Sequence, residues 1–89
     1  MQEIIKTQFM EAHYLNGLLH REDGPALIRY GKYQCWYLNG QLHRENGPAV
    51  EHSNCLIYCQ NGKNHREDGP AVIHPNGKNE YWTNGNKSI

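Results

Sequence analysis

The sequence predicts an all-β fold: a single meandering antiparallel sheet built from tandem β-hairpin repeats of 22 to 23 residues. The first observation is a motif, His-Arg-Glu-Asp/Asn-Gly-Pro-Ala, that begins at His20, His43 and His65. The second is the frequency of hairpin-turn pairs, because Asn-Gly occurs six times and Asp-Gly twice. The third is that the runs between these turns are short and rich in aromatic and β-branched residues, which favours strands over helices.

Each repeat is expected to contain one hairpin. The expected pairs are residues 4–6 with 9–14, 26–30 with 33–38, 49–52 with 55–60, and 71–74 with 79–83. The motif would then link one hairpin to the next. Its Asp or Asn can form an Asx-turn, its Gly can adopt a positive φ, and its Pro keeps the preceding residue out of the helical region. The expected product is a solenoid-like sheet of about eight short strands, in which each hairpin contacts mainly its neighbours.

The 89 residues form one repeat domain, divided by the motif into a partial unit and three full units. The partial unit is 1–19, the full units are 20–42, 43–64 and 65–87, and a truncated end follows at 88–89. Because the chain opens and closes inside a unit, unpaired edge strands are expected near residues 4–9 and 85–89. Two chains could pair through these edges, which makes a homodimer an expectation.

Composition narrows the possible partners and the compartment. Nine basic and nine acidic residues give a formal net charge of zero, which argues against nucleic acid as a partner and offers no attraction to anionic lipid. The chain contains no apolar run long enough to span a membrane and no signal-peptide pattern. Cys55 and Cys59 would lie about 13 Å apart on one strand, too far for a disulfide. Together with Cys35 they are expected to be free thiols of a cytoplasmic protein.

The repeat resembles the MORN repeat in its hairpin period, its Asn-Gly turn and its basic-flanked His. The resemblance is closest at Gly62-Lys63-Asn64-His65 and in the aromatic strand ends Trp36-Tyr37 and Tyr81-Trp82. After the His the motif departs from the usual Gly-x-Gly and is similar to a variant repeat, "NGKxHREDGPA", that is common in large DNA viruses and bacteriophages. The resemblance implies scaffold, dimerisation or lipid-binding roles and does not by itself imply one activity.

The motif is rich in residues that carry chemistry, but its repetition favours a structural role. Successive motif histidines would lie about 10 Å apart, too far to share one metal ion. An active site is normally built once, whereas Arg and Glu recur in every copy, and Asn46 stands where the other copies have Asp. We therefore expect no enzyme activity, no cofactor and no metal. The expected structural residues are His20, Arg21, Glu22, Gly24, Pro25, His43, Arg44, Glu45, Gly47, Pro48, His65, Arg66, Glu67, Gly69 and Pro70.

The hairpin tips differ between copies, and this is where a binding surface is expected, although neutral drift of exposed loops gives the same pattern. Tyr and Trp are the residues most enriched at binding hot spots. The candidates for partner contact are therefore Tyr30, Tyr33, Trp36, Tyr58, Tyr81 and Trp82, and the alternative is that half of them form a packed sheet face.

The favoured function is a small, non-enzymatic protein-interaction module. Given the virus-like repeat, a phage or viral protein that binds and inhibits a host factor in the host cytoplasm is one instance. The alternatives are a self-assembling scaffold, or a binder of a small ligand or lipid headgroup on the aromatic face. Nucleic acid ranks last because the chain has no basic excess.

Overall fold

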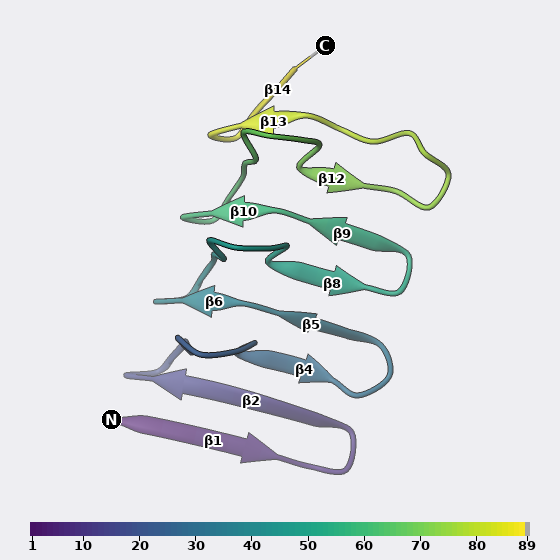
Figure 1. The fold of residues 1–89 in the computed structure, drawn as a ribbon. Coiled ribbons are helices and arrows are strands. Elements are labelled where there is room, and N and C mark those ends of the chain that lie inside the picture. Colours follow the sequence, from purple (N-terminus) through teal and green to yellow (C-terminus); the bar gives the residue numbers. More distant parts are fainter. Residues whose placement is uncertain (89) are drawn as a thin grey trace.

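The computed structural model describes residues 1–88, which form an all-β fold without helices (Figure 1). Its main sheet has eight strands and is antiparallel throughout. Seven strands follow the order β1-β2-β4-β5-β8-β9-β12, and β3 pairs with β2. These strands are β1 (Gln2–Lys6), β2 (Met10–Leu15), β3 (Leu18–Leu19), β4 (Leu27–Arg29), β5 (Tyr33–Cys35), β8 (Val50–His52), β9 (Cys55–Ile57) and β12 (Val72–Ile73). The predicted fold class, all-β with one large meandering sheet, is confirmed.

The molecule is an elongated plate of 41 × 25 × 16 Å. The hairpin tips line one long edge of this plate, and the Asn-Gly turns line the other (Figure 1). Among residues 1–88, no helix is long and apolar enough to cross a bilayer.

The tip hairpins form largely where the sequence places them. β1 returns into β2 with Lys6 opposite Glu11, and β4 returns into β5 with Arg29 opposite Tyr33. The last predicted pair is too long: the β-pairing between residues 71–74 and 79–83 is limited to the isolated bridge between Val72 and Glu80. Side-chain amides in this longer tip bind backbone N–H groups instead, since Asn79 accepts from His74 and Asn76 accepts from Lys78.

The expectation of one hairpin per unit is wrong, because four of the six Asn-Gly pairs form additional, smaller hairpins. Asn39 and Gly40, with φ of 50° and 78°, connect β6 (Tyr37–Leu38) to β7 (Gln41–Leu42). Two successive positive φ values are the signature of a type I′ turn. The same turn joins β2 to β3, β10 (Cys59–Gln60) to β11 (Lys63–Asn64), and β13 (Trp82–Thr83) to β14 (Asn86–Lys87).

The buried residues are small. Ala12, Ala26, Ala49 and Ala71 have no exposed surface, and Cys59 is the largest fully buried side chain. The alanines of the motif sit where the chain leaves the motif and enters the next strand, and their backbone N–H groups donate to the neighbouring strand. Because the sheet buries few large hydrophobic side chains, its stability depends on the contacts that recur along the chain.

Candidate functional site

The arginine of each motif folds back over its own turn. Nη1 of Arg44 donates to the carbonyl of Pro48 at 3.2 Å, and Arg21 and Arg66 make the same bond to Pro25 and Pro70. The motif glycine lies between the arginine and the proline in the sequence, and there is no room for a larger residue. A Cβ on Gly47 would lie 2.8 Å from Cζ of Arg44. The motif glycines do not have positive φ, so the predicted role of Gly24, Gly47 and Gly69 as left-handed turn residues is wrong.

In two of the three motifs the guanidinium also covers an aromatic ring from the preceding segment of the chain. Cζ of Arg44 lies 3.7 Å from the ring centroid of Trp36, and Cζ of Arg66 lies 4.0 Å from that of Tyr58. These are cation–π distances. Trp36 and Tyr58, two of the predicted partner contacts, are therefore half-buried and pack against the repeated motif.

Each motif histidine joins the Asn-Gly hairpin before it to the Asn-Gly hairpin after it. Nδ1 of His20, His43 and His65 accepts the backbone N–H of Asn39, Asn61 and Asn84 at 2.9, 3.0 and 3.0 Å. An accepting Nδ1 places the ring proton on Nε2, which faces the Glu two residues later in the motif. The three imidazoles therefore act as a ladder of acceptors for the Asn-Gly turns. Among residues 1–88, no three metal-ligating side chains come together.

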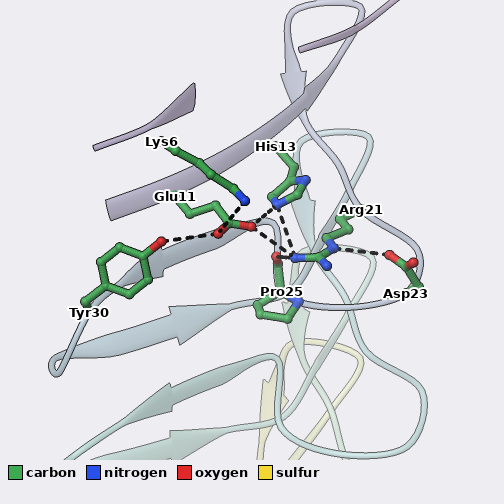
Figure 2. A network of polar contacts seen from close by, with 7 residues as sticks. All are labelled: Lys6, Glu11, His13, Arg21, Asp23, Pro25 and Tyr30. Atoms are coloured by element: carbon green, nitrogen blue, oxygen red, sulfur yellow. Dashed lines mark hydrogen bonds and ion pairs between the residues drawn. The ribbon is translucent and has the colours of Figure 1, made fainter. Parts of the chain in front are cut away.

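The first unit carries a polar network of its own (Figure 2). Glu11 accepts hydrogen bonds from His13 and from the Tyr30 hydroxyl, and it lies 3.5 Å from Nη1 of Arg21 and 3.9 Å from Nζ of Lys6. The hydrogen bond from His13 is the main cause that lowers the pKa of the Glu11 carboxyl, and burial opposes it. The network fixes the outer end of the Tyr30 side chain, although 47% of this residue is exposed.

Beside this network lies a group that we call the tip surface: Arg29, Tyr30, Lys32, Tyr33 and His52. Arg29, Tyr33 and His52 are directly opposite one another on β4, β5 and β8, so they share one face of the sheet. The rings of Tyr33 and His52 stack with centroids 5.9 Å apart and planes inclined by 15°. These residues line a shallow hollow of about 450 Å³. Of the six predicted contact residues, Tyr33 lies on this face of the sheet. Tyr30 lies at the same tip, but its hydroxyl reaches Glu11, which is in register with Ile28, Gln34 and Glu51 on the opposite face.

Phe9 is a neighbour of this surface that sequence reasoning missed. It lies at the tip of the β1–β2 hairpin, is 66% exposed, and accepts the backbone N–H of Tyr30 at 3.1 Å. The sequence could have indicated Phe9, because it is an apolar aromatic residue at a predicted hairpin tip, where polar residues are usual.

The remaining two candidates lie in the C-terminal unit, because β13 begins at Trp82 and Tyr81 precedes it. β13 is separated from β4, β5 and β8 (Figure 1). Tyr81 is 54% exposed. Nε1 of Trp82 donates to Glu80 at 2.9 Å, which holds the indole against its own strand.

The three cysteines are free, as the sequence predicts. Cys35 and Cys59 are buried and Cys55 is half-buried. Burial, and secondarily Cys35, raises the pKa of the Cys59 thiol to about 11. A thiol in this state is a packing group.

Comparisons with protein-family models, with curated proteins and with solved structures give no match for this chain. The resemblance to MORN-like repeats stays a prediction from the motif.

Proposed function

We propose that this chain is a non-enzymatic protein-interaction module whose contact region is the tip surface. The observation that carries the proposal is the ordering of accessible aromatic rings there. Tyr33 is stacked on His52, and Tyr30 is held by its hydroxyl bond to Glu11. Aromatic side chains that are ordered before binding lose little entropy on association and are typical of interface hot spots.

The division of the molecule into a frame and variable tips supports this proposal. The Arg–Pro and His–Asn hydrogen bonds recur in all three copies of the motif, and they occupy groups that looked chemically active. The tip hairpins do not repeat: one presents Tyr30 and Lys32, the next Ser53 and Asn54. A constant frame with variable tips is how repeat proteins build binding surfaces.

Several finer points belong to the same proposal. We propose that the hairpin units form a MORN-like solenoid, and that the partner is a host factor inhibited in the host cytoplasm by a phage or viral protein. The motif similarity supports these points. Homodimerisation through edge strands stays a prediction.

The proposal can be tested by capturing partners from cell lysate with immobilised protein. The wild-type chain is compared with the Tyr30→Ala/Tyr33→Ala variant and with Tyr81→Ala, which removes an exposed aromatic residue outside the tip surface. We expect the wild type and Tyr81→Ala to retain one stoichiometric protein, and the double variant to lose it while keeping its β circular dichroism spectrum. The proposal fails if no protein is retained, or if all three chains retain it equally.

A further inference from the structure

We infer that the partner presents an acidic, extended segment to the tip surface, with carboxylates that lie across β4, β5 and β8. This inference rests on the proposed function and specifies the chemistry of its partner. The chemistry of the partner follows from the donor groups and positive charges of the tip surface that have no partner within the described residues.

The tip surface offers donors and cations without matching acceptors. Within residues 1–88, Arg29 and Lys32 form no side-chain hydrogen bond and no ion pair. Nδ1 of His52 accepts the backbone N–H of Asn54 at 3.2 Å, so its proton is on Nε2, which has no partner in the described part of the chain. Three donors are thus left for a ligand.

The neighbouring carboxylates cannot satisfy these donors because both are directed elsewhere. Glu11 is engaged by His13, Tyr30, Arg21 and Lys6, as described above. Glu51 accepts a hydrogen bond from Gln34 and lies 3.7 Å from Nη1 of Arg44. Glu51 alternates with His52 along β8, so it projects from the opposite face of the sheet. A carboxylate facing Arg29 and His52 must therefore come from another molecule.

The distance between Arg29 and His52 determines how the acidic side chains of the partner must be spaced. Arg29 and His52 are separated by two strand spacings, or about 10 Å, with Tyr33 between them. An extended chain advances about 3.3 Å per residue and its side chains alternate between two faces. Acidic side chains two or four residues apart, about 7 or 13 Å, therefore point the same way and bracket this separation. The intervening residues would lie over the stacked Tyr33 and His52 rings.

A protein segment fits this surface better than single-stranded nucleic acid. Nucleic acid also uses aromatic rings and cations, but it needs a positively charged groove that follows the backbone. The tip surface contributes only two full cations. At the opposite edge the motif turns present highly exposed carboxylates, including Asp23 and Asp68, whose side chains are 88% and 90% exposed.

The inference is testable by fluorescence anisotropy with three labelled probes. The first is a twelve-residue peptide of alternating acidic residues and glycine, the second is the same peptide with every Asp and Glu replaced by Asn and Gln, and the third is a twelve-nucleotide oligo-dT. The proteins are the wild-type chain, Arg29→Glu/Lys32→Glu, and the matched control Lys63→Glu/Lys87→Glu. The control makes the same change in net charge in the Asn-Gly hairpins.

We expect the wild type to bind the acidic peptide, to ignore the amide peptide, and to lose affinity as salt rises. Reversal of the two tip charges should weaken binding at least about tenfold, and the control should change it less than about twofold. Absence of acidic-peptide binding, tighter binding of oligo-dT, or an equal loss in the control would overturn the inference. If lysate capture requires Tyr30 and Tyr33 but tolerates Arg29→Glu/Lys32→Glu, the proposed function stands and this inference alone fails.

Discussion

The backbone N–H of Asn61 donates a hydrogen bond to Nδ1 of His43 across 3.0 Å, although the two residues belong to successive Asn-Gly hairpins. The same bond joins His20 to Asn39 and His65 to Asn84. Since the molecule buries few large side chains, each of these bonds is a main link between neighbouring Asn-Gly hairpins. The motif histidine is therefore a structural acceptor.

The His43–Asn61 bond predicts which substitutions the motif tolerates. The amide oxygen of His43→Asn can occupy the Nδ1 position, whereas His43→Gln has its amide too far along the side chain. We expect His43→Gln to lower the free energy of unfolding by about 1–2 kcal/mol, because a backbone N–H loses its partner. His43→Asn should lose less than half of that in urea denaturation. Equal losses in the two variants would show that the acceptor at Nδ1 is not what matters.

The contact between Gly47 and Arg44 predicts a strong coupling. Gly47→Ala should lower the free energy of unfolding by about 1–3 kcal/mol, because the new methyl group displaces the guanidinium from its place over Trp36. In an Arg44→Ala background the same change should cost much less, and the double-mutant cycle measures the difference. Tryptophan emission should shift in Gly47→Ala. Additive losses would mean that backbone conformation, and not the arginine, requires glycine here.

Glu11 predicts how stability depends on pH. Its pKa is lowered from the ordinary value of 4.5, chiefly by the hydrogen bond from His13, so the folded state favours the ionised form. The resulting stabilisation is present at neutral pH and is lost as the pH falls below 4.5 through the lower folded-state pKa. Glu11→Gln should therefore reduce the difference in melting temperature between pH 7 and about pH 3. Glu22→Gln, at a carboxylate whose side chain is 83% exposed, is the control and should leave the difference unchanged.

The cysteines predict a simple labelling pattern. Cys35 and Cys59 are buried and their thiol pKa values are raised by burial, to about 11 for Cys59. Since the thiolate is the reactive form, a disulfide reagent at about pH 8 should modify one thiol rapidly in the native protein and the other two only after unfolding. Cys55→Ser should abolish the rapid phase. A rapid phase that survives this substitution would place an exposed thiol at Cys35 or Cys59.

The turns and short hairpins were predictable because they depend on local conformation. Asn39-Gly40 adopts two positive φ values that few other residue pairs tolerate, and Arg29 pairs with Tyr33 where the sequence places a tip. Repetition of the motif predicted a structural role for its histidines, and the structure gives each of them the same hydrogen bond to a backbone N–H. The small hairpin at each of these Asn-Gly turns was not predicted, because its strands, such as β6 and β7, are only two residues long.

The sequence by itself determined the all-β class and the meandering order of the tip hairpins, since turn residues act through their own φ and ψ angles. Only the tertiary structure decided what the motif glycine does, which aromatic rings remain accessible and which cations remain unpaired. Glycine is required at position 47 because the Arg44 side chain folds back onto it, and the same side chain covers Trp36. Tyr33 is stacked on His52, which is 19 positions farther along the chain. These contacts depend on distances through space, and the spacing of residues along the chain does not specify them.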